Sequence, residues 1–160
     1  MNAADSSLAK QAAASAAAAR LWTTSSAQRG ARLQRHWSPA PLPCGGTPAY
    51  ITRHGFGYSS FEHTEDGIHS LMTVFVDAEA PVKFIVLRIR NNSGRSRRLS
   101  ATGYVEWVLG DIRSRNMRHT ITELDRQTGA VLAVNRYNSE FENRVAFFDT
   151  DDTGRTFTTD

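Results

Sequence analysis

The dipeptide Asp66-Gly67 constrains the fold of this 160-residue chain more than any other short motif. It lies between two segments, 58–64 and 68–76, that are rich in residues favoured by β-strands. Asp-Gly between two such segments is the strongest local signal for a β-hairpin, because both turn residues must adopt positive φ. Apolar side chains occur at both parities of 68–76, so we expect this strand to be covered on both faces, as in a sandwich.

The rest of the chain after residue 36 has the same character. Further strand candidates lie at 50–53, 82–91, 97–109, 119–125, 130–136 and 145–149. The prolines between Ser38 and Pro43 predict an extended segment, since each proline moves its predecessor out of the helical region. These patterns predict an all-β fold, an antiparallel β-sandwich, and the length fits one domain of about 100–150 residues.

Residues 1–35 have a different composition. Ten of the first twenty residues are alanine, and large apolar side chains are rare among them. Alanine favours a helix over 8–20, but such a helix has little apolar surface to bury. We therefore expect a tail, disordered or a frayed helix, before a sandwich domain at 36–160. A mitochondrial transit peptide and a start site that departs from the natural upstream sequence are the alternatives.

The basic charge of the chain comes mainly from this tail. The formal net charge is +3, with a pI near 9.4. Residues 1–35 hold five basic residues and one acidic residue, so they contribute +4 and the remainder sums to −1. The charge therefore argues against nucleic acid as a partner. The chain also has no apolar run of 18 residues for a membrane segment, and its single cysteine excludes an internal disulfide.

A cluster of arginines surrounds the predicted turn at 92–94. We interpret it as a solvated hairpin. A nucleic-acid-binding surface would favour aromatic side chains interleaved with the basic side chains on one face. The members of the cluster are Arg88, Arg90, Arg95, Arg97 and Arg98.

The segment 53–58, with the sequence Arg-His-Gly-Phe-Gly-Tyr, is the most unusual short stretch. Its two glycines permit positive φ or a close approach of the backbone to another group. Arg53 and His54 are donors suited to sugar hydroxyls or phosphate. In the alternative interpretation this is a glycine-bent strand whose aromatic rings, Phe56 and Tyr58, fill the core. The stretch lacks the lysine of a phosphate-binding P-loop, so nucleotide binding is excluded.

Glu62 and His63 place a carboxylate beside an imidazole. Adjacent strand residues point to opposite faces, so we expect that the two side chains do not serve one site. The histidines have no metal-ligand spacing, and we predict no catalytic residue, metal ion or cofactor. The candidate carbohydrate-binding or interface residues are Arg53, His54, Gly55, Gly57, Tyr58, Glu62 and His63.

Segments 37–43 and 53–58 together resemble the N-terminal supersandwich domain of glycoside hydrolase family 94, formerly glycosyltransferase family 36. The phosphorylase-like region of cyclic β-1,2-glucan synthases is the most similar part of that family. Further stretches that agree with it lie at 61–68, 92–100, 104–110 and 122–148.

The resemblance implies a galactose-mutarotase-like supersandwich, which we expect to be incomplete in this chain. It also implies a partner, the (α/α)6 barrel that carries the general acid in this family. The family catalyses phosphorolysis or transglycosylation of β-linked glucosides, so β-glucan is the implied ligand. We expect a non-catalytic, carbohydrate-associated fragment of a cyclic β-1,2-glucan synthase-like protein, and a stand-alone carbohydrate-binding module is the alternative. A cytoplasmic location, in a family often attached to the inner membrane, and a homo-oligomer are further expectations.

Overall fold

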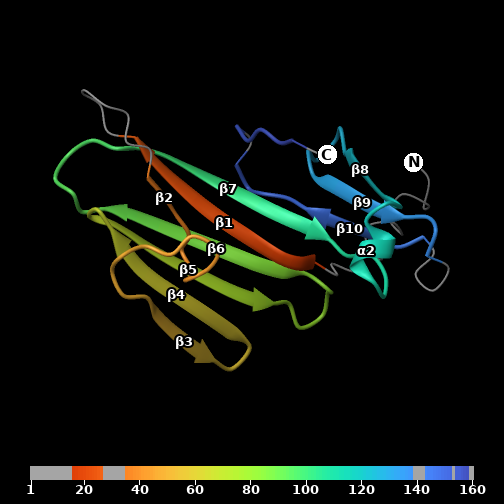
Figure 1. Ribbon diagram of the computed structural model, residues 1–160, viewed down its shortest axis with the longest axis horizontal. Helices are drawn as coiled ribbons and strands as arrows, with labels where there is room; N and C mark the ends of the chain where they lie inside the picture. The colour runs from red at the N-terminus through yellow and green to blue at the C-terminus, as the bar shows by residue number, and fades with distance from the viewer. Residues whose placement is uncertain (1–15, 27–34, 139–142, 153, 159–160) are drawn as a thin grey trace. The chain divides into compact units, whose positions relative to one another are not determined.

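The computed structural model describes residues 16–26, 35–138, 143–152 and 154–158, and almost all of its regular structure is β-strand (Figure 1). The elements are β1 Ala16–Ser26, β2 Arg35–Trp37, β3 Ile51–Gly55, β4 Tyr58–Glu65, β5 Ile68–Val76, β6 Lys83–Asn91, β7 Arg98–Trp107, α2 Arg113–Asn116, β8 Thr120–Leu124, β9 Val131–Asn135 and β10 Val145–Phe148. They form three sheets with the strand orders β2-β1-β7, β3-β4-β5-β6 and β10-β9-β8. The predicted all-β, antiparallel fold is confirmed.

The sheet β3-β4-β5-β6 is an antiparallel meander in chain order. Asp66 and Gly67 form the turn between β4 and β5 with φ values of 48° and 75°. Positive φ at both positions is what a type I′ hairpin requires, so the predicted hairpin is confirmed. The turn places Glu65 opposite Ile68 and thereby sets the register of the whole β4–β5 ladder.

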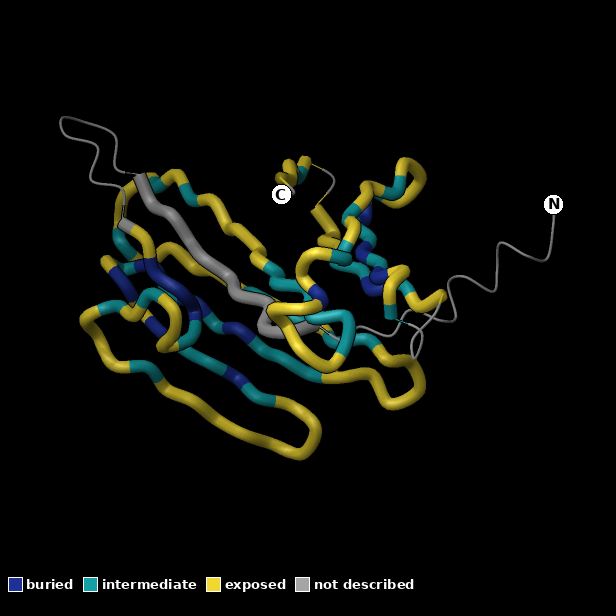
Figure 2. Tube along the Cα trace, turned by 45° about the vertical axis from the view of Figure 1, so that its right-hand side comes forward, coloured by how far each residue is buried: buried dark blue, intermediate teal, exposed yellow. Residues whose placement is uncertain are grey.

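Residues of different burial follow one another along β4 and β5 (Figure 2), and the strand register places them on two faces that differ in burial. Ile68, Ser70 and Met72 are buried on one face of β5, and His63 and Glu65 are buried beside them on β4. The alternate side chains of β5 are only partly buried. In the described part of the chain β5 is therefore buried on one face from Ile68 to Met72, and not on both faces as expected. We call these the core face and the open face.

Two turns meet at one end of this sheet. The backbone N–H of Asn92 donates to the carbonyl of Gly67 over 2.8 Å. The guanidinium of Arg97 donates to the carbonyl of Asp66, and the exposed fraction of its side chain is only 3%. Arg97 thus departs from the predicted solvated arginine cluster, because it crosses to the neighbouring turn, while the other four arginines are exposed.

The segment predicted to be extended closes into a loop instead. It is non-helical, but the N–H of Ser38 donates to the carbonyl of Cys44 over 2.8 Å. The hydroxyl of Ser38 donates to the carbonyls of Ala40 and Cys44. Proline excludes the helix, but it does not prevent these local hydrogen bonds from turning the chain back on itself.

Strand β1 lies inside the predicted tail. Residues 16–26 pair with β2 and lie between β2 and β7, so a disordered or frayed-helical tail does not describe them. A central strand gains hydrogen-bonding partners on both sides, and this outweighs the preference of alanine for a helix. Residues 1–15 and 27–34, which belong to the same prediction, lie outside the described residues.

The chain forms two compact units, and the sheet β3-β4-β5-β6 belongs to the unit made of Ala19–Ala78 and Lys83–Tyr104. The other unit contains β8, β9 and β10, where Asp125 and Gly129 form the turn between β8 and β9. Buried Asn116 of α2 hydrogen-bonds Asn135 of β9 in that unit. Among the described residues no helix is long and apolar enough to cross a membrane.

Candidate functional site

The predicted 53–58 segment is the turn end of the β3–β4 hairpin. Gly57 occupies the turn with a φ of 79°, where a residue with a side chain is strained. Gly55 has another role, since a Cβ atom there would collide with the ring of Tyr58, its cross-strand partner. The two glycines therefore serve the two purposes expected of them, a positive φ and a close approach.

The aromatic residues of this hairpin do not fill the core. Phe56 is fully exposed at the turn, and 49% of Tyr58 is exposed. Every residue of β3 is exposed as well. The interpretation of a glycine-bent strand with core aromatics is therefore wrong, because Phe56 is fully exposed and Tyr58 is only half-buried.

An open groove adjoins the turn end of the hairpin. Four predicted site residues, His54, Gly55, Gly57 and Tyr58, contribute to its lining. The other lining residues are Ser59, Val74, Phe75 and Val76. His54 and Ser59 are cross-strand partners, and the distance between Nδ1 of His54 and Oγ of Ser59 is 2.9 Å. The groove therefore combines an apolar wall with a polar pair that can exchange hydrogen bonds with hydroxyl groups.

Arg53 and Glu62 lie on the open face. The guanidinium of Arg53 donates to Oε2 of Glu62 over 2.6 Å, and Nε2 of His69 on β5 lies 3.2 Å from Oε1. These two hydrogen bonds hold the pKa of the Glu62 carboxyl below its usual range. Glu62 is therefore a carboxylate that accepts hydrogen bonds at neutral pH, and it is a poor general acid.

His63 lies on the core face, where only 2% of it is exposed. Its Nε2 is 3.2 Å from Oε2 of Glu65, and the ring of Tyr50 stacks on it with centroids 3.8 Å apart. The predicted separation of Glu62 and His63 onto opposite faces is confirmed by the strand register. The structure does not bring His63 to the groove.

Tyr50 ties the loop before β3 to the core face. Its hydroxyl accepts from the N–H of Gly46 over 2.8 Å and donates to the carbonyl of Ser38 over 3.1 Å. Burial raises the pKa of the Tyr50 phenol. A Cβ atom at Gly46 would collide with Glu65 and His63, so only glycine lets the loop approach this closely. We call residues 38–50 the strap.

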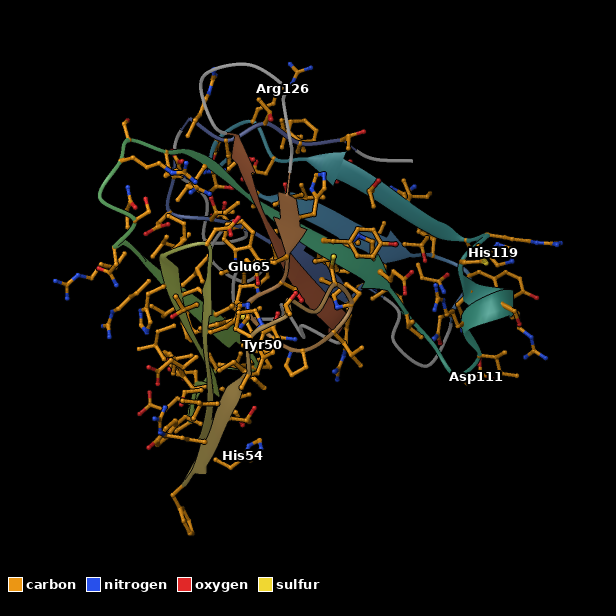
Figure 3. All side chains as sticks on the ribbon, turned by 60° about the vertical axis from the view of Figure 1, so that its left-hand side comes forward. Tyr50, His54, Glu65, Asp111, His119 and Arg126 are labelled. Atoms are coloured by element: carbon orange, nitrogen blue, oxygen red, sulfur yellow. The ribbon has the colours of Figure 1, made fainter. Side chains whose placement is uncertain are left out.

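Figure 3 shows His54, which lines the groove, toward the turn of the β3–β4 hairpin. Tyr50 of the strap and Glu65 of the core face lie near the other end of that hairpin. Sequence reasoning missed Tyr50, Ser59, Glu65 and His69. The hairpin signal contains part of the missing information: once Asp66-Gly67 sets the register, His69 becomes the diagonal neighbour of Glu62. No comparable local signal places Tyr50 on His63.

The titratable groups of the described residues form no cluster of three or more His, Cys, Asp or Glu suited to a metal ion. No carboxylate lines the groove. The groove therefore offers hydrogen-bonding groups beside apolar side chains, and its described lining residues include no pair of carboxylates of the kind that glycosidases use.

Residues 29–160 match the family described as Glycosyl hydrolase 94, supersandwich domain. This match begins inside the segment 1–35 that was predicted to be a tail. The chain is 40% identical over 102 residues to the cyclic beta-(1,2)-glucan synthase NdvB of Rhizobium meliloti (strain 1021), a match that covers 64% of this chain and 4% of that protein.

Two phosphorylases are similar as well. The N,N'-diacetylchitobiose phosphorylase of Vibrio furnissii is 32% identical over 103 residues, covering 64% of this chain and 12% of that enzyme. The solabiose phosphorylase of Paenibacillus borealis is 34% identical over 82 residues, covering 51% of this chain and 11% of that enzyme. The chain thus spans only a small fraction of the length of these curated relatives.

Proposed function

The chain belongs to the glycosyl hydrolase 94 family through its supersandwich domain, and from this premise we propose that it acts as a non-catalytic, carbohydrate-associated domain. We assign it to a protein of the cyclic β-1,2-glucan synthase type. The observation that carries this proposal is the match of residues 29–160 to the supersandwich domain, which includes the exposed hairpin.

The chemistry of the hairpin supports a non-catalytic role. Cleavage of a glycosidic bond requires a general acid whose pKa is raised toward the working pH. Glu62 has the opposite property, since Arg53 and His69 hold its pKa down. Glu65 lies next to His63 on the buried core face, away from the groove. We therefore place the catalytic acid in the (α/α)6 barrel that the family resemblance implies, as the partner of this domain.

The turn end of the hairpin is the part that we propose to face the barrel or its glucan. Arg53 and His54 are exposed donors, and Gly57 keeps the turn tight. The groove beside them accepts hydroxyl groups through His54 and Ser59. In this proposal β-glucan is the ligand, nucleic acid is not a partner, and the protein works in the cytoplasm.

A chimera tests the proposal. In the Rhizobium meliloti glucan synthase, the matched segment is exchanged for its counterpart from this chain, and synthesis of cyclic glucan is measured. We expect an active chimera, and a weaker one when the exchanged segment carries Gly57→Val, which strains the turn. A folded but inactive chimera contradicts the proposal. So does release of a sugar phosphate when this chain alone is mixed with inorganic phosphate and β-1,2-linked glucose oligosaccharides.

A stand-alone carbohydrate-binding module is the second candidate, favoured by the exposed Phe56 and Tyr58. It predicts that the chain binds β-1,2-glucan but does not restore synthesis in the chimera. Titration calorimetry of this chain with β-1,2-glucan measures the binding, and the absence of heat counts against a module.

A further inference from the structure

A row of aromatic residues crosses the open face of the sheet. The register pairs Gly55 with Tyr58, Tyr58 with Phe75, and Phe75 with Phe84. Directly opposed residues of antiparallel strands project from the same face, so the three rings lie in one line from β4 to β6. The rings of Phe75 and Phe84 stack with centroids 5.2 Å apart and an angle of 22° between their planes.

The glycine at the edge of this row makes room for it. The ring of Tyr58 lies where a Cβ atom of residue 55 would be, so Gly55 lets the ring extend over the edge strand. Aromatic rings that cover an edge glycine across a strand pair are a recognised stabilising arrangement. The result is an apolar strip that reaches from β3 to β6.

The row remains accessible in the described structure. Tyr58 is 49% exposed and Phe84 is 43% exposed, and Phe75 between them is partly buried. The buried apolar residues of this sheet, Ile68 and Met72, belong to the core face instead. The aromatic row is therefore a surface feature and not the core of its sheet.

Polar groups run alongside the row. The next residues along the open face are the exposed Arg53 and the partly buried Thr73, with the buried Ser60 between them. Glu62 lies beyond them and accepts from Arg53. A guanidinium supplies several donors, a carboxylate supplies acceptors, and hydroxyls supply both. Aromatic rings beside such groups match a ligand that has a flat C–H surface and a rim of hydroxyls, which is the chemistry of a pyranose ring.

The length of the row sets the size of the ligand. Neighbouring strands are about 4.8 Å apart, so the row from β4 to β6 spans about 10 Å. This is comparable with the length of a disaccharide, and the strip over Gly55 extends it further. A protein partner fits less well, because glutamate is depleted from protein interfaces and Glu62 lies beside the row.

We propose that the row formed by Tyr58, Phe75 and Phe84 is a stacking platform for a β-linked gluco-oligosaccharide of more than two sugar units. Tyr58 and Phe75 also contribute to the groove, but the side chains of His54 and Ser59 project from the other face of the sheet, so the platform does not include their polar pair. The inference rests on the proposed function, since it assumes that the chain handles carbohydrate.

The test measures the affinity of the full chain for glucose and for β-1,2-linked glucose oligosaccharides of increasing length, by titration calorimetry. We expect the affinity to rise from the monosaccharide to the trisaccharide. Phe84→Ala should weaken trisaccharide binding about three- to tenfold, because one stacking contact is lost. The matched control is Val86→Ala, which removes an exposed apolar side chain from the same strand and face without removing a ring.

A second variant separates binding from folding. Phe84→Trp retains a stacking surface and should keep the affinity of the original chain, whereas Phe84→Leu retains apolar volume and should not. Circular dichroism checks that each variant is folded. Affinity that does not depend on chain length, or equal losses in Phe84→Ala and Val86→Ala, overturns the inference.

A self-association of the chain that Phe84→Ala abolishes and that oligosaccharides do not compete with also overturns it, because a second copy would then occupy the row. These outcomes are distinct from failure of the proposed function. An active chimera without length-dependent binding refutes only the platform.

Discussion

The two faces of the sheet β3-β4-β5-β6 each carry a histidine and a glutamate with the same separation. Nε2 of His63 lies 3.2 Å from Glu65 on the core face, and Nε2 of His69 lies 3.2 Å from Glu62 on the open face. The exposed fractions of the side chains are 0% and 10% in the first pair but 30% and 31% in the second. The same chemical pair therefore occurs in two environments, and the environment decides its role.

The core-face pair holds the strap in place. His63 projects from β4, and its ring packs against the strap by stacking on Tyr50. Removing either partner leaves polar groups buried without their hydrogen bonds, which is expensive. The open-face pair keeps a carboxylate ionised on an accessible surface, where solvent screens the interaction. The first pair maintains structure, and the second remains available to a ligand.

The largest effect is expected from His63→Ala. It removes the stack with Tyr50 and the contact with Glu65, and we expect the free energy of unfolding to fall by about 3 kcal/mol. His69→Ala on the open face is the matched control and should cost less than about 1 kcal/mol. Urea denaturation of both variants measures the difference. Equal losses would mean that burial does not distinguish the two pairs.

Gly46→Ala probes how closely the strap approaches the core face. The new methyl group collides with Glu65 and His63, so we expect a loss of about 2 kcal/mol through displacement of the strap. Gly55→Ala is its counterpart at the turn end, where the colliding group is the exposed ring of Tyr58, which can turn away into solvent. Thermal melting should show a large decrease for the first variant and a small one for the second.

Tyr50→Phe removes one hydroxyl and keeps the stack on His63. We expect a loss of about 1 kcal/mol at neutral pH, because the N–H of Gly46 loses its acceptor. The native pKa of Tyr50 is raised, so the unfolded state releases this proton first and stability falls as the pH rises above about 10. This alkaline loss should be smaller in Tyr50→Phe. Denaturation between neutral and alkaline pH tests the prediction, and identical profiles would contradict it.

The smallest effect is expected from Glu62→Gln. The native pKa of Glu62 is lowered by Arg53 and His69, so its ionised form stabilises the fold at neutral pH. This contribution is present above the pKa of the unfolded state and disappears as the pH falls through the lower native pKa. The original chain should therefore lose its small advantage over Glu62→Gln in acid. If the difference in stability between the original chain and Glu62→Gln instead widens toward low pH, the predicted direction of this pH dependence is wrong.

The predicted strands after residue 36 were found because their patterns are local. Alternation of side chains and turn residues identified β3 to β10 within a few residues of their observed bounds. The tail prediction is wrong for residues 16–26, because β1 depends on pairing with β2 and on a place beside β7. Such pairing is decided by distant segments and has no signature in the alanine-rich sequence itself.

The candidate site was predicted in part. The sequence singled out the stretch 53–58, but not as a hairpin, and it predicted the separation of Glu62 from His63, which follows from the strand period of two. It did not identify Phe84, because a ring on a distant strand joins the aromatic row only after β4, β5 and β6 are paired in register.

By itself, the sequence determined where the chain turns and which side chains share one face of a strand. Asp66-Gly67 selects a hairpin through backbone φ, and alternation then assigns each side chain to one face or the other. Only the tertiary structure decided which face is covered. The strap brings Tyr50 onto His63 and leaves Tyr58 exposed, because burial depends on which distant segment packs against a strand and not on the residues of the strand.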